Sequence, residues 1–111
     1  MDTRELLELA AKAAGYALGK MGAYVNDCGD ICPAYWNETK KIYWNPLEDD
    51  GDALRLTVKL TLEVDVCQTG VAVRTPTGVK VLVDSKEEPN AYAATRRAIV
   101  RAAAEIGRAM P

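Results

Sequence analysis

The sequence contains no histidine and no phenylalanine, and both absences limit what it can do. Without histidine the chain lacks the commonest general base of enzymes and the commonest nitrogen ligand of zinc. We therefore expect a non-enzymatic protein with no catalytic residue, no cofactor and no metal site. Without phenylalanine, the aromatic area comes from five tyrosines and two tryptophans, whose polar groups favour positions at the border of a core.

The sequence also lacks an excess of basic charge. Lys and Arg number 14 against 16 Asp and Glu, and the formal net charge is −2. Because a duplex-binding surface usually leaves a basic footprint, the composition argues against nucleic acid as a partner. No apolar run approaches the length of a membrane span, and residues 1–5 lack the features of a signal peptide. We expect no membrane partner and a cytoplasmic location.

Cysteine is scarce and odd in number, which argues against a disulfide framework. Cys28 and Cys32 are four positions apart, and Cys67 is distant in the chain. Structural zinc usually takes two tight cysteine pairs, or cysteine with histidine, and a redox pair usually has two intervening residues. The spacing favours free thiols over either site, and it leaves their role open.

What is present is the composition of an ordinary globular domain. The chain has 111 residues, of which 49% are hydrophobic and 27% charged. This length is close to the commonest domain size and supports one core. We expect a single domain over residues 1–111.

The first third of the chain predicts one helix and a β-hairpin. Residues 3–18 have helical apolar spacing, Asp2 and Glu5 are placed as a capping box, and glycines follow at 19 and 22. A short strand at 23–25 and a loop at 26–33 come next. Two aromatic clusters then flank a turn at 37–41, which predicts a hairpin. Its aromatic side chains are our candidate surface for a protein partner or self-association: Tyr35, Trp36, Tyr43 and Trp44.

The segment 47–66 carries two conflicting patterns. From Leu54 to Val66 apolar residues alternate strictly with polar ones, which is typical of a half-buried strand. The acidic cluster at 48–52 is instead typical of a helix start, where the dipole favours negative charge. A helix over 54–60 would bury one apolar edge through Leu56 and a second edge through Leu54 and Val58. The acidic cluster is better explained by capping than by calcium, because only part of a calcium loop is present.

The last third is simpler. Strands are predicted at 70–75 and 79–84 around a Thr-Pro-Thr-Gly turn, and a helix at 91–108 with Asn90 as its cap. On the polar face of that helix, Arg97, Arg101 and Arg108 are candidate phosphate contacts. The alternative explanation is that these arginines form the solvent-exposed face of the helix and bind nothing. The net acidic charge of the chain favours that explanation.

Two segments together resemble the phage ABA sandwich domain, a family of small phage and prophage proteins of uncharacterised function. They are residues 44–56 (WNPLEDDGDALRL) and 90–103 (NAYAATRRAIVRAA). The resemblance implies an α+β fold in which helices pack on a central antiparallel sheet, a helix/sheet/helix sandwich. It also supports dividing the ambiguous segment into a helix at 50–60 and a strand at 61–67. With the elements predicted above, this division gives the approximate order α-β-β-α-β-β-β-α, an α+β fold.

The resemblance implies no catalytic residues. We therefore expect a phage- or prophage-encoded accessory domain in the cytoplasm of a bacterial host cell, which acts by binding another protein or a second copy of itself. The alternative is a nucleic-acid-binding module that uses the three arginines.

Overall fold

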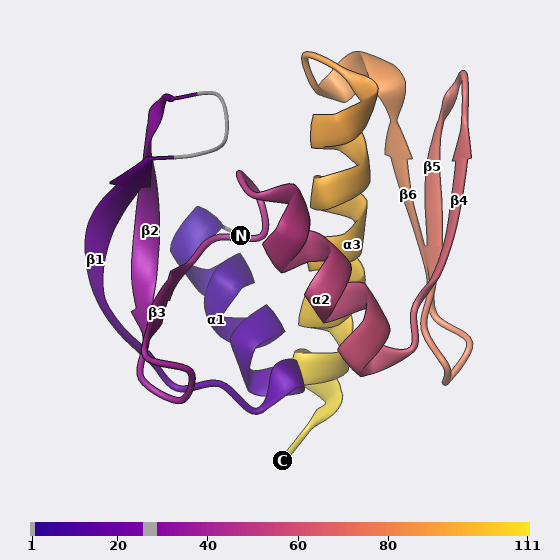
Figure 1. The fold of residues 1–111 in the computed structure, drawn as a ribbon. Coiled ribbons are helices and arrows are strands. Elements are labelled where there is room, and N and C mark those ends of the chain that lie inside the picture. The colour runs from indigo at the N-terminus through magenta and orange to yellow at the C-terminus, as the bar shows by residue number, and fades with distance from the viewer. Residues whose placement is uncertain (1, 26–28) are drawn as a thin grey trace.

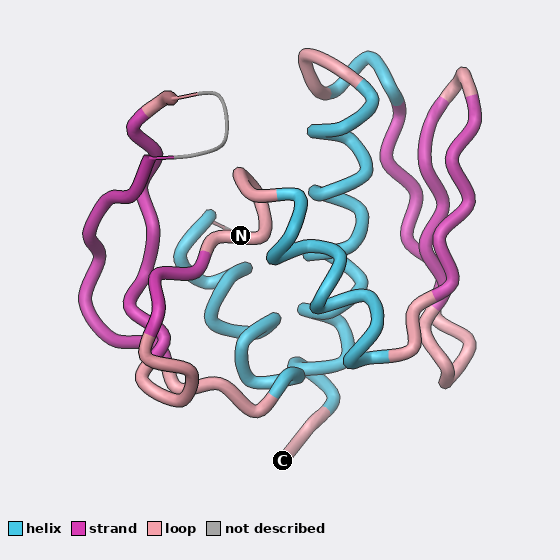
Figure 2. The backbone as a smooth tube through the Cα atoms, in the orientation of Figure 1, coloured by secondary structure: helices cyan, strands magenta, loops and turns pink. Residues whose placement is uncertain are grey.

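The computed structural model describes residues 2–25 and 29–111, which form three α-helices and two three-stranded antiparallel sheets. This confirms the α+β class and the approximate element order. The layers differ from the expected sandwich with one central sheet. Here the helices lie in the middle, with one sheet on either side of them (Figures 1 and 2).

Helix α1 (Thr3–Ala14) begins as predicted and ends earlier. The Asp2 side chain accepts a hydrogen bond from the Glu5 amide at 2.8 Å, which caps the helix. Gly15 then adopts a left-handed conformation, with φ 79°, and its N–H turns back to the carbonyls of the last turn. The predicted helix over 15–18 is therefore wrong, because a C-cap glycine ends it first.

The first sheet consists of β1 (Leu18–Val25), β2 (Ile31–Asn37) and β3 (Ile42–Trp44) in that order. The predicted hairpin is β2–β3, and the strand expected at 23–25 is the end of a longer strand. Gly22 lies in β1 beneath the ring of Tyr43, so close that a Cβ atom there would stand 2.6 Å from the ring. The glycine therefore makes room for an aromatic side chain instead of ending a helix.

The ambiguous segment contains both a helix and a strand. Helix α2 (Asp50–Leu60) is capped by Asp49, whose side chain accepts a hydrogen bond from the Asp52 amide at 2.8 Å. Thr61, with φ 54°, ends the helix, and β4 (Glu63–Cys67) follows. The division into helix 50–60 and a following strand is confirmed, and so is the interpretation of the acidic cluster as a cap.

The second sheet consists of β4, β5 (Gly70–Arg74) and β6 (Lys80–Asp84), with β5 in the centre. A short 3-10 helix (Ser85–Glu87) leads to α3 (Ala91–Ala109), which Asn90 caps as predicted. The inward side chains Val71, Val73 and Val83 are buried against α3.

Helix α3 occupies the middle of the molecule because it is apolar on most of its circumference. Eight of its residues are buried, and at 100° per residue they are distributed over most of the helix surface. One side packs on α1, another on β5 and β6, and a third on α2. The strands of the second sheet alternate between apolar and polar residues and can cover this helix with one face only, so that sheet forms an outer layer.

Candidate functional site

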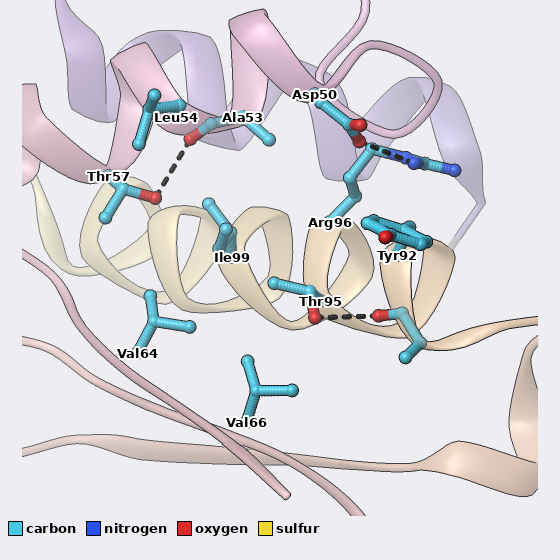
Figure 3. A pocket seen from close by; sticks show the side chains of 11 residues that line it. Asp50, Ala53, Leu54, Thr57, Val64, Val66, Tyr92, Thr95, Arg96 and Ile99 are labelled. Atoms are coloured by element: carbon cyan, nitrogen blue, oxygen red, sulfur yellow. Dashed lines mark hydrogen bonds and ion pairs between the residues drawn. The ribbon is translucent and has the colours of Figure 1, made fainter.

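An apolar groove lies between α2, α3 and β4 and is here called the α2–β4 groove. Its volume is about 680 Å³, within the range of roughly 300 to 1,000 Å³ typical of binding sites. Figure 3 shows the side chains that form its walls. The apolar ones are Ala53, Leu54, Val64, Val66, Ala91, Tyr92 and Ile99.

The groove exists because α3 covers only part of the second sheet. Val66 is paired with Val71, so the two side chains point to the same face of the sheet. Val71 lies under α3 and is buried, whereas Val66 is 53% exposed. The inward face of β4 is therefore apolar, with Val64 partly buried against the core and Val66 left uncovered.

Helix α2 forms the opposite wall and exposes apolar side chains of its own. Ala53 and Leu56 pack into the core, whereas Leu54 is 63% and Val58 71% exposed. The sequence predicts a broad apolar face on this helix, and only the edge through Leu56 is buried. The sequence also predicts that the second edge, through Leu54 and Val58, is buried in the core. This edge is exposed instead, because no element of the described chain covers it.

The threonine hydroxyls and the charged groups of the groove are already bound to the protein. Thr57 donates its hydroxyl hydrogen to the Ala53 carbonyl at 2.9 Å, and Thr95 donates to the Ala91 carbonyl at 2.7 Å. At one end Arg96 Nη1 lies 2.7 Å from Asp50 Oδ1, and its Nε donates to the Leu47 carbonyl. These bonds, drawn in part in Figure 3, leave an interior that favours apolar ligand groups.

The aromatic hairpin is divided between the core and the surface. Trp44 is 3% and Tyr35 8% exposed, and the Trp44 ring meets Tyr16 edge to face. Trp36 and Tyr43 stack edge to face on the other side of the sheet, where Tyr43 is 43% exposed. The four candidate residues do not form one surface, because directly successive residues of a strand face opposite ways.

The three candidate arginines are each paired with a glutamate. Arg97 lies 3.1 Å from Glu88, Arg101 3.6 Å from Glu87, and Arg108 3.5 Å from Glu105. A smaller polar hollow of about 350 Å³ is lined by Arg96 and Arg97, and both are already in ion pairs. The positive charge of this face is largely neutralised within the protein.

The acidic cluster has a structural role at the start of α2. Asp52 is buried, and it accepts hydrogen bonds from the Asn45 amide at 3.0 Å and from Arg55 at 2.8 Å. Burial raises the pKa of the Asp52 carboxyl, and these two hydrogen bonds offset part of the shift. Burial likewise raises the pKa of the nearby Tyr24 hydroxyl, with smaller contributions from the charges of Asp49 and Asp52.

The cysteines show no grouping among the described residues. Cys32 is buried in β2, Cys67 is exposed in β4, and Cys28 lies outside the described ranges. No three potential metal ligands among histidine, cysteine, aspartate and glutamate come together in residues 2–25 and 29–111. In the same ranges no helix is long and apolar enough to cross a membrane.

No protein-family model matches this chain, and no curated protein and no solved structure is significantly similar to it. The geometry of the α2–β4 groove is therefore the main source of functional information.

Proposed function

We propose that this chain is a non-enzymatic binding domain that holds an apolar segment of another protein in the α2–β4 groove. The observation that carries the proposal is the set of exposed apolar side chains in and beside the groove: Leu54 and Val66 on its two walls, and Val58 on the margin of α2. Contiguous exposed apolar surface is typical of interaction sites.

The lining supports binding over chemistry. Among the described residues of the lining, the one carboxylate and the one guanidinium, Asp50 and Arg96, bind each other, and the threonine hydroxyls bind helix carbonyls. A general acid or base must be able to reach a substrate, and paired groups of this kind are instead structural.

The extent of the apolar surface favours a protein over a small molecule. Val58 lies outside the groove lining and is 71% exposed, so apolar surface on α2 continues beyond the cavity itself. Small-molecule sites instead enclose most of the ligand. A partner with several apolar side chains would cover both the groove and this margin.

Peptide display against the purified protein tests this function. We expect enriched peptides to bind Leu54→Asp at least about tenfold more weakly than wild type, because a charge would enter the apolar wall. Leu82→Asp is the matched control, since Leu82 is 65% exposed on the opposite face of the second sheet. The proposal fails if no peptide is enriched, or if Leu54→Asp binds as well as wild type.

The phage or prophage origin and the bacterial cytoplasm are part of the same proposal, supported by the resemblance of residues 44–56 and 90–103. Gene neighbourhood tests both. We expect phage structural or regulatory genes beside this one, and a setting of chromosomal housekeeping genes would contradict the proposal.

A further inference from the structure

The strand that forms the floor of the groove is also at the edge of its sheet. β4 pairs with β5 on one side, and no described strand pairs with its other side. In an antiparallel ladder every second residue of such a strand directs its N–H and C=O groups away from the partner. An open edge of this kind can accept a further strand.

A strand added at this edge would extend the floor of the groove. Adjacent strands of a sheet lie about 4.8 Å apart, and the axes of packed helices lie about 8–10 Å apart. One helix spacing therefore corresponds to about two strand spacings, so a helix packed beside α3 lies over the sheet about two strands away from α3. Helix α2 packs beside α3, and its Leu54 forms the wall opposite β4. Inward side chains of the added strand would therefore continue the row of Val64 and Val66 and face α2.

The charges of β4 indicate what the outward side chains of such a strand should be. Glu63 and Asp65 alternate with the two valines and lie on the solvent face of the sheet. Asp65 lies opposite Ala72 and forms no ion pair with any residue in 2–25 or 29–111. Within the same ranges, Glu63 forms one long ion pair, at 3.9 Å from Arg74. Basic side chains beside them would be favourable, because opposite charges on neighbouring strands attract.

The same charges argue against a second copy of this chain as the added strand. An antiparallel pairing centred on Asp65 would place the two Asp65 carboxylates side by side, and like charges directly opposite each other are destabilising. Charged residues on an edge strand are a common protection against self-pairing.

We propose that the α2–β4 groove takes an extended protein segment in which apolar residues alternate with lysine or arginine, added as a fourth strand beside β4. This inference rests on the proposed function and names the class of partner. The apolar side chains enter the groove beneath α2, and the basic side chains lie beside Glu63 and Asp65.

A labelled, capped peptide of alternating lysine and valine tests the inference by fluorescence anisotropy. We expect it to bind wild type, while a peptide of alternating glutamate and valine does not. The double variant Glu63→Lys, Asp65→Lys should reverse this preference, with at least about a tenfold loss for the lysine peptide. Both substitutions are at exposed positions, so the fold should tolerate them.

Two controls separate strand addition from general charge attraction. The variant Glu5→Lys, Glu48→Lys changes net charge by the same amount at exposed sites away from the groove, and it should bind the lysine peptide like wild type. A peptide of the same composition with its lysines grouped together should bind weakly, because it cannot place valines on one face. Equal binding of the two lysine peptides would overturn the inference.

The display experiment distinguishes failure of this inference from failure of the proposed function. If selected peptides depend on Leu54 but form amphipathic helices or lack alternating basic residues, the inference is wrong and the groove still binds protein. If no peptide binds, both are wrong. Light scattering tests a second copy of the chain as the occupant. A dimer that the double variant Glu63→Lys, Asp65→Lys abolishes or strengthens would identify that second copy and would also overturn the inference.

Discussion

Gly107 in α3 lies directly against the backbone of Leu9 in α1. A Cβ atom on Gly107 would overlap the carbonyl oxygen of Leu9. Both helices carry alanines along this contact, among them Ala10 and Ala103, so the backbones approach directly. A side chain of any size at this position requires the helices to separate.

We expect Gly107→Ala to lower the free energy of unfolding by about 1–3 kcal/mol, the usual cost of overpacking a core. In an isolated helix the same substitution would stabilise the helix by about 1 kcal/mol. The sign of the measured change in unfolding free energy therefore tests whether Gly107 is in close contact with α1. Gly51→Ala is the control. Gly51 is also helical, and the atoms nearest to a Cβ atom there are side-chain atoms, the Arg55 guanidinium at 3.1 Å and Asp49 Oδ2 at 3.2 Å.

Urea denaturation measures both variants. Gly51→Ala should be much milder than Gly107→Ala, since small shifts of the Arg55 and Asp49 side chains accommodate the Cβ atom, whereas the Leu9 backbone cannot shift without moving α1. A neutral or stabilising effect of Gly107→Ala would show that α1 and α3 are not held as closely as described.

At the scale of elements, α2 has two apolar edges with different roles. The edge through Leu56 packs into the core, and the edge through Leu54 lines the groove. The sequence predicts both edges and gives no reason to separate them, because leucine spacing is the same for a core contact and for a binding site. Only the position of β4 and α3 decides which edge remains open.

We expect Leu56→Ala to lower the free energy of unfolding by about 2–4 kcal/mol, because Leu56 is 1% exposed and its loss leaves a cavity. Leu54→Ala should change it by less than about 0.5 kcal/mol, since an exposed side chain loses few contacts. Chemical denaturation measures both. A large effect of Leu54→Ala would mean that this edge supports the fold and is not available to a partner.

At the scale of the whole molecule, the two sheets are joined through the helices between them. Trp36 and Trp44, the only tryptophans in the chain, both lie in the first sheet. Trp44 packs against Tyr16, and it belongs to one buried cluster with residues of all three helices and of the second sheet. A shared core of this kind favours cooperative unfolding of both sheets.

We therefore expect tryptophan fluorescence and far-UV circular dichroism to report the same urea midpoint. Val73→Ala removes buried volume from the second sheet, at a cost of about 2 kcal/mol, and should shift both midpoints equally. Fluorescence that did not respond to Val73→Ala would show that the first sheet unfolds independently, and would contradict the single-domain prediction.

Local chemistry in the sequence predicted most of the elements. Asp2 and Asn90 cap helices as expected, and the turn at 75–78 joins two predicted strands. These signals depend on neighbouring residues only, so they can be recognised without the fold. The helix over 50–60 was the exception, since periodicity alone favoured a strand and the family resemblance was needed to divide the segment. The C-terminal end of α1 was missed because alanine spacing continued past Gly15, where the backbone turns left-handed.

The sequence by itself determined the α+β class, the helix caps, the lack of histidine chemistry and the alternating strands of the second sheet. The tertiary structure alone decided the layer order, the division of the aromatic hairpin between core and surface, and the α2–β4 groove. The physical reason is that apolar residues occur with the same spacing along the sequence whether or not another element covers their side chains in the fold. The absence of histidine removes histidine-based chemistry, whereas the groove depends on which apolar side chains α3 leaves uncovered.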